Sequence, residues 1–106
     1  MRVGVTLPHM GDAANAASVD VAAQRAEVLG YDTVWVADRL LYPLAPRTPY
    51  PGTPDGSLPE LYRRVLDPVA TLTFVAAHTR RLRVGTAVLD LPFYTPVPLE
   101  IGRAHV

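Results

Sequence analysis

The chain has 106 residues, of which 49% are hydrophobic and 19% are charged, so the sequence predicts one folded globular domain and excludes disorder. Ten basic and ten acidic side chains cancel, which gives no reason to expect a nucleic-acid or membrane partner. The absence of cysteine excludes disulfides, thiol nucleophiles and thiolate metal sites and fits a cytoplasmic protein.

Residues 2–7 are predicted to form the first strand. The stretch is rich in valine, ends at Pro8, and is nearly all apolar, as expected of a strand buried on both faces of a parallel sheet. It has no small-residue cleavage site, so we expect no signal peptide. No apolar run approaches the ~20 residues of a transmembrane helix, so we expect no membrane span either.

A helix is predicted over residues 19–29. Ser18 is a suitable N-cap, Asp20 places a carboxylate in the first turn, and Gly30 supplies the stop. The second strand is predicted over residues 33–37, where Trp35 is expected to belong to the core rather than to a cofactor stack.

Residues 40–66 form a long segment that carries six of the eleven prolines. A loop of this length is usually either functional or a linker. We weigh two interpretations, an ordered lid and a disordered insertion. Its tyrosines (Tyr42, Tyr50 and Tyr62) and the regular elements on either side favour the ordered lid, and a short helix is expected over residues 58–66.

The second half of the chain repeats the strand–helix–strand pattern. Asp67 and Pro68 are a strong helix start, and the helix is predicted over residues 68–79, followed by a third strand over 82–88. Two successive βαβ units predict a parallel sheet with right-handed crossovers.

Three folds share this order of elements. A dinucleotide-binding fold or a phosphate-binding loop needs a glycine-rich turn after the first strand, but residues 8–12 contain one glycine. A receiver-like signalling domain would have an acidic pair there instead of Pro8 and His9. The remaining interpretation is an α/β fold, the N-terminal part of a (β/α)8 TIM barrel with about three βα units and parallel strands. That fold carries its chemistry on loops at the carboxyl ends of its strands.

Three segments carry a resemblance to a known family: residues 30–39 (GYDTVWVADR), residues 67–72 (DPVATL) and residues 83–89 (RVGTAVL). In this order and spacing they resemble the bacterial luciferase-like monooxygenase superfamily, most of all its coenzyme F420-dependent oxidoreductase branch. The resemblance covers residues 1–99. It implies a barrel of about 250 residues or more, so residues 1–99 would be its N-terminal portion. Residues 100–106 are expected to be a non-native tail of a truncated chain.

Asp38 and Arg39 are the candidate catalytic residues, and Asp38 is also a cofactor-binding candidate, because a carboxylate at the end of a barrel strand points into the mouth. The resemblance implies that a matching acid lies beside the cofactor ring, while the structural alternative is an acid that caps a loop or pairs with its neighbour. Arg39 stands where many relatives have histidine. It stays charged and could bind a phosphate or stabilise an anionic reduced ring, or form a surface ion pair.

Thr86, Ala87 and Val88 are the second candidate site, for cofactor binding. Here the resemblance implies a non-proline cis peptide, between Ala87 and Val88, that supports the central ring of the cofactor. His9 ends the first strand at the same mouth and is a further cofactor-binding candidate, although a lone histidine is more often structural. No set of His, Asp and Glu has metal-ligand spacing.

The resemblance implies an oxidoreductase that transfers a hydride, or activates oxygen, on a small organic substrate. Coenzyme F420 is the expected cofactor, with FMN as the alternative, and the parent is expected to be a homo-oligomer. We expect the 106-residue chain alone to be inactive. The alternative from another class is a non-enzymatic small α/β domain that binds a partner through a sheet edge.

Overall fold

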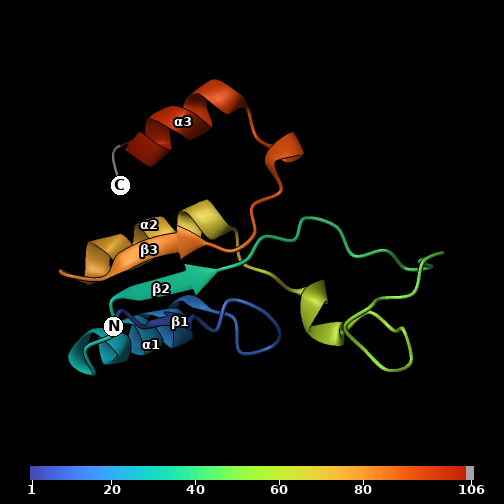
Figure 1. Cartoon of the computed structure of the whole chain (residues 1–106), viewed down its shortest axis with the longest axis horizontal. Coiled ribbons are helices and arrows are strands. Elements are labelled where there is room, and N and C mark those ends of the chain that lie inside the picture. The colour runs from blue at the N-terminus through green and yellow to red at the C-terminus, as the bar shows by residue number, and fades with distance from the viewer. Residues whose placement is uncertain (105–106) are drawn as a thin grey trace.

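The computed structural model of the chain describes residues 1–104, with side chains described for residues 1–100. Three parallel strands form one sheet in the order β1-β2-β3, as predicted (Figure 1). In chain order the elements are β1 (Gly4–Thr6), α1 (Ala16–Val28), β2 (Thr33–Val36), η1 (Glu60–Arg63), α2 (Pro68–His78), β3 (Arg83–Thr86), η2 (Leu91–Phe93) and α3 (Pro96–Ala104). The chain therefore has the α/β architecture of a partial barrel.

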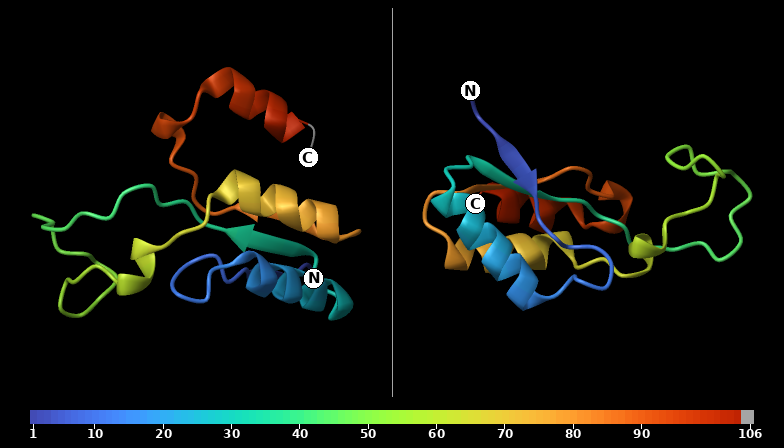
Figure 2. Two further views of the ribbon diagram at one scale, coloured as in Figure 1. Left: turned by 180° about the vertical axis from the view of Figure 1, so that it is seen from behind. Right: turned by 90° about the horizontal axis from the view of Figure 1, so that it is seen from below.

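Both α1 and α2 cover the same face of the sheet (Figure 2). Valines at alternate positions of β2 point into this layer, because successive side chains of a strand point to opposite faces. The hydrophobic core consists of Leu7, Val19, Ala23, Ala26, Val34, Val36, Leu72 and Val75. The helix α3 lies beyond β3, on the side away from β1 (Figure 1).

The opposite face of the sheet is open, and Trp35 lies on it with 37% of its surface exposed. The prediction of a core position for Trp35 is wrong, because its neighbours Val34 and Val36 take the buried face. Its indole lies across the flanking strands: a Cβ built at Gly4 would be 2.5 Å from the indole Nε1, and one at Gly85 2.5 Å from Cζ3. Glycine at both positions is what lets the ring lie flat on the sheet.

The N-terminus of α1 differs from the prediction. Asn15 is the N-cap, and its side-chain oxygen accepts from the backbone N–H of Ser18 at 2.9 Å. The helix thus begins at Ala16, with two alanines that favour helix ahead of Ser18, and Asp20 lies beyond the first turn. The predicted cap of α2 is confirmed, since Asp67 accepts from the N–H of Ala70 at 2.7 Å.

The proline-rich segment extends away from the sheet as an irregular loop (Figure 1). The expected short helix is a single 3-10 turn, η1. Contacts within the segment define its path: the hydroxyls of Tyr50 and Tyr62 are 3.0 Å apart, and the N–H of Tyr50 donates to the carbonyl of Gly56 at 2.8 Å. These contacts favour the ordered alternative, while a role as a lid stays a prediction.

Two further expectations concern a membrane-spanning helix and the C-terminal tail. None of the described helices is long and apolar enough to cross a membrane. The suggested non-native tail overlaps α3, which runs to Ala104, and its last two residues lie outside the described part of the chain. Its origin stays a prediction.

Glu27 of α1 holds the turn between α2 and β3. One carboxylate oxygen accepts from three consecutive backbone N–H groups, those of Arg80, Arg81 and Leu82, at 2.9, 2.5 and 3.3 Å. The N–H groups of Arg81 and then Arg80 are the largest causes that lower the pKa of Glu27 below its usual 4.5. The carboxylate therefore joins the two βαβ units through the backbone.

We predict that Glu27→Gln makes the chain less stable at neutral pH and flattens its acid unfolding. Because the pKa of Glu27 is lower in the folded than in the unfolded chain, its contribution is complete above about pH 4.5 and is lost as the pH falls through the lowered value. Urea unfolding at pH 7, 5 and 3 measures this. Glu60→Gln, which removes an exposed ion pair with Arg63, is the control and should change little. Parallel pH profiles for the wild type and Glu27→Gln would contradict the assignment.

Candidate functional site

The carboxyl ends of the three strands meet at one edge of the sheet, as the parallel topology predicts. The backbone N–H of Asp38 donates to the carbonyl of Val88 at 3.1 Å, which joins the ends of β2 and β3. The ring of His9 contacts the backbone of Ala37 at 2.8 Å, which joins the ends of β1 and β2. The candidate residues of the sequence analysis therefore lie at a single mouth.

His9 is buried, with 3% of its surface exposed, and both ring nitrogens have partners. Nε2 accepts from the N–H of Ala37, so this nitrogen carries no proton, and Nδ1–H donates to the carbonyl of Leu7 at 2.8 Å. The carbonyl of His9 accepts from the N–H of Leu66 at 2.9 Å. This geometry favours the structural alternative for His9, and its contact with a cofactor stays a prediction.

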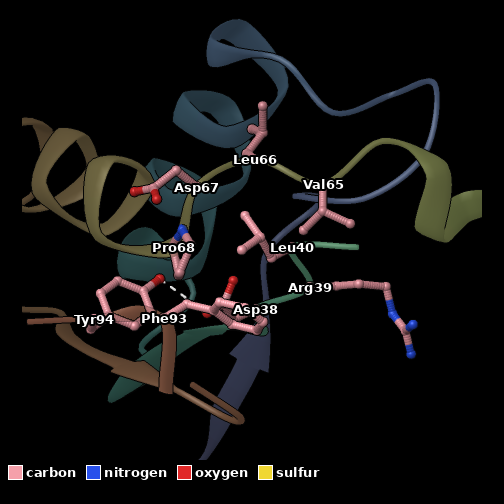
Figure 3. A pocket seen from close by; sticks show the side chains of 9 residues that line it. All are labelled: Asp38, Arg39, Leu40, Val65, Leu66, Asp67, Pro68, Phe93 and Tyr94. Carbon is pink, nitrogen blue, oxygen red and sulfur yellow. Dashed lines mark hydrogen bonds between the residues drawn. The ribbon is translucent and has the colours of Figure 1, made fainter. Parts of the chain in front are cut away.

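Asp38 is half-buried, and its carboxylate is held at one oxygen. Oδ2 accepts from the backbone N–H of Asp90 at 3.1 Å and from the hydroxyl of Tyr94 at 3.0 Å (Figure 3). The other oxygen, Oδ1, has no donor among the described residues. Asp38 thus caps the loop after β3, as its structural alternative proposes, and still presents a free acceptor at the mouth.

Sequence reasoning missed Tyr94. It follows η2, whose turn brings the phenol onto Asp38. Burial, followed by the hydrogen bond to Asp38, raises the pKa of Tyr94 to about 12, so the phenol is a hydrogen-bond donor at neutral pH. The only available signal is a tyrosine in the loop after a strand at the same edge, which is too common to single it out.

The third strand ends without the expected cis peptide: the described residues contain none, so the prediction for the Ala87–Val88 bond is wrong. The N–H of Ala87 donates to the carbonyl of Val36 at 2.8 Å, which continues the ladder of β2 and β3 in ordinary trans geometry. Thr86 is half-buried, whereas Ala87 and Val88 are exposed. These two side chains are accessible at the mouth.

Arg39 points away from Asp38 (Figure 3). Its guanidinium carbon lies 4.3 Å from the centre of the Tyr62 ring, which is a cation–π contact. Within the described chain, the ion pair found is that of Arg63 with Glu60, so the surface ion pair suggested for Arg39 is not formed. Its stem contributes to the mouth while its charged end contacts the proline-rich segment.

A cleft of about 310 Å³ opens beside these residues, a size at the lower end of small-molecule sites. Its lining residues come from the ends of β2 and of the proline-rich segment, the start of α2, and η2 with the residue after it (Figure 3): Asp38, Arg39, Leu40, Val65, Leu66, Asp67, Pro68, Phe93 and Tyr94. Across the described residues, no three His, Cys, Asp or Glu side chains gather as a metal site.

Comparison with known proteins identifies what the chain is similar to. The family model described as luciferase-like monooxygenase matches residues 1–99. Three curated relatives are 37% identical over 79 residues: uncharacterised proteins of Mycobacterium bovis and of two strains of Mycobacterium tuberculosis. The match covers 74% of this chain but 28% of each relative, so the chain spans little more than a quarter of their length. No solved structure matches.

We predict that Tyr94→Phe reduces the free energy of unfolding by about 1.5 kcal/mol, because it removes a hydroxyl that donates to a carboxylate. The raised pKa of Tyr94 gives this contribution its pH dependence: it is complete below pH 10.0 and is lost as the pH rises toward about 12. Urea unfolding at pH 7 and 11 measures both effects. Tyr31→Phe removes a hydroxyl that has no hydrogen bond within the described chain, so it is the matched control. Equal losses for the two variants would contradict the role of Tyr94.

Proposed function

Since the chain belongs to the luciferase-like monooxygenase family, we propose that residues 1–99 form the first three βα units of an oxidoreductase barrel that uses coenzyme F420. FMN is the alternative coenzyme. One observation carries the proposal: the Asp38 carboxylate is held at Oδ2 by Asp90 and Tyr94 and leaves Oδ1 without a donor in the described chain. A fixed carboxylate at the carboxyl end of a barrel strand is the usual place for site chemistry.

The described residues fit the ring end of such a coenzyme. Oδ1 of Asp38 can accept a hydrogen bond from a ring N–H or a hydroxyl group, and the neighbouring Ala87 and Val88 offer exposed small and apolar side chains for a flat ring. Between residues 1 and 104, no glycine-rich turn follows a strand to hold a phosphate tail, so that tail would depend on other parts of the parent protein. When bound, coenzyme F420 supplies hydride chemistry, and reduced FMN supplies electrons to oxygen.

In this proposal the chain's own residues bind and orient the coenzyme and the substrate. Oδ1 of Asp38 accepts a hydrogen bond from a donor group of the bound molecule. Tyr94 keeps the carboxylate in one orientation by donating a hydrogen bond to Oδ2. Apolar side chains of the cleft, Leu40 and Phe93 among them, lie exposed beside that carboxylate and offer an apolar surface to a bound molecule. We further propose that the substrate is a small organic molecule and that the parent is a cytoplasmic homo-oligomer.

A second candidate function follows from the sheet edges. In the described sheet β1 and β3 each pair on one side only, and such edges can accept a strand from another protein. The alternative is therefore a non-enzymatic domain that binds a partner by strand addition. The coding sequence after residue 99 separates the two, because about 150 or more further residues of the same family favour the enzyme.

We predict that Asp38→Asn in the parent protein reduces coenzyme affinity or kcat/KM by at least about tenfold, since a hydrogen bond to a charged group is worth about 1.5–3 kcal/mol. The parent is titrated with coenzyme F420 and with FMN by fluorescence, and turnover is measured with each. Asp12→Asn, an exposed acid after β1, is the control and should change neither value. Unchanged affinity and turnover in Asp38→Asn would remove Asp38 from the site.

The 106-residue chain should bind both coenzymes weakly or not at all in the same titration. A barrel site collects residues from many strand ends, and three strands are present here. Stoichiometric binding of either coenzyme to a soluble monomer, at micromolar concentration or below, would contradict the proposal that the site depends on further barrel units.

A further inference from the structure

We propose that Arg39, together with the hydroxyl pair of Tyr50 and Tyr62, is a carboxylate-binding group at the rim of the cleft, and that the cleft selects apolar organic monocarboxylates. Only the further step, that such a monocarboxylate is the substrate of the parent enzyme, rests on the proposed function. Binding of the carboxylate itself needs no coenzyme.

The first observation is a contrast between two arginines of the same segment. Each stacks on a tyrosine: Arg63 lies 4.5 Å from the ring centre of Tyr42, and Arg39 lies 4.3 Å from that of Tyr62. Arg63 also forms an ion pair with Glu60. Arg39 is the more covered of the two, yet its guanidinium N–H groups have no acceptor among the described residues. Stacking uses the flat face of a guanidinium and leaves its in-plane donors available for a carboxylate.

The tyrosine pair adds a further donor. The hydroxyls of Tyr50 and Tyr62 are 3.0 Å apart, so one proton lies between them. The second hydroxyl proton has no acceptor in the described chain. The two rings meet edge to face, with centres 5.9 Å apart, and the ring of Tyr62 also carries the guanidinium of Arg39 on its face. Donors without acceptors at one place favour an anionic ligand.

The cleft and its charges narrow the class of anion. The apolar part of the lining comprises Leu40, Val65, Leu66, Pro68 and Phe93, and the volume of about 310 Å³ suits a small apolar body. Asp38 and Asp67 line the same cleft, so its charged groups are two carboxylates and one guanidinium. Two nearby negative charges repel a dianion such as phosphate more than a monoanion. The guanidinium points out of the cleft, so the carboxylate of a bound molecule would lie at the outer rim (Figure 3).

The test uses the 106-residue chain, because every residue of the proposed group lies within it. Hexanoate is titrated against the chain at pH 7 by NMR, following the backbone amides of Arg39 and Tyr62. Hexanamide, which has the same apolar body without the charge, and inorganic phosphate are titrated in parallel. The variants are Arg39→Gln, Arg39→Lys and Tyr50→Phe. Arg47→Gln is the matched control, since Arg47 is an exposed arginine of the same segment.

We expect saturable hexanoate binding, at least tenfold weaker binding of hexanamide and of phosphate, and at least tenfold weaker hexanoate binding in Arg39→Gln. Arg39→Lys keeps the charge without the planar donors, so its hexanoate affinity should lie between those of the wild type and Arg39→Gln. Tyr50→Phe should weaken hexanoate binding severalfold. Arg47→Gln should bind hexanoate as the wild type does. Far-ultraviolet circular dichroism confirms that each variant is folded. Equal binding of hexanoate and hexanamide, or equal hexanoate binding in Arg39→Gln and the wild type, would overturn the proposal. Neither result depends on a coenzyme, so failure here is distinct from failure of the Asp38→Asn test.

Discussion

The buried imidazole of His9 holds the carboxyl ends of β1 and β2 in one place, and the arrangement of the mouth depends on it. Its Nε2 accepts from the N–H of Ala37, and its Nδ1–H returns to the carbonyl of Leu7. Its own carbonyl receives the N–H of Leu66, at the end of the proline-rich segment. The amides of Ala37 and Leu66 are half-buried, so the loss of either acceptor is expected to cost about 1 kcal/mol.

The candidate site follows directly from this contact. Ala37 is the residue before Asp38, so the imidazole fixes the backbone from which the carboxylate projects. The N–H of Asp38 itself donates to the carbonyl of Val88. The Asp38 carboxylate accepts hydrogen bonds from the N–H of Asp90 and the hydroxyl of Tyr94, both in the loop after β3. The two parallel pairings thus end in a connected set of hydrogen bonds. One carboxylate oxygen lies within that set, and the other is available for a ligand.

The sequence predicts the scaffold better than the site. Element order, parallel pairing and the Asp67 cap follow from local patterns, and each is confirmed. Asn15 and Ser18 are both good caps, so the start of α1 depends on the alanines between them. The core prediction for Trp35 is wrong because hydrophobicity alone suggests burial, whereas strand alternation puts the side chain on the open face. The partners of Asp38 and Arg39 lie in loops distant in sequence, and no local pattern connects Tyr94 or Tyr62 with them.

NMR on the intact chain tests most directly whether His9 assembles the mouth, because it reports which ring nitrogen carries the proton and how the ring is hydrogen-bonded. We expect the ring proton on Nδ1, none on Nε2, and an Ala37 amide that exchanges with solvent about as slowly as those of the central strand. A ring protonated at Nε2, or an Ala37 amide that exchanges as fast as that of exposed Asp12, would contradict the claim that this contact assembles the mouth.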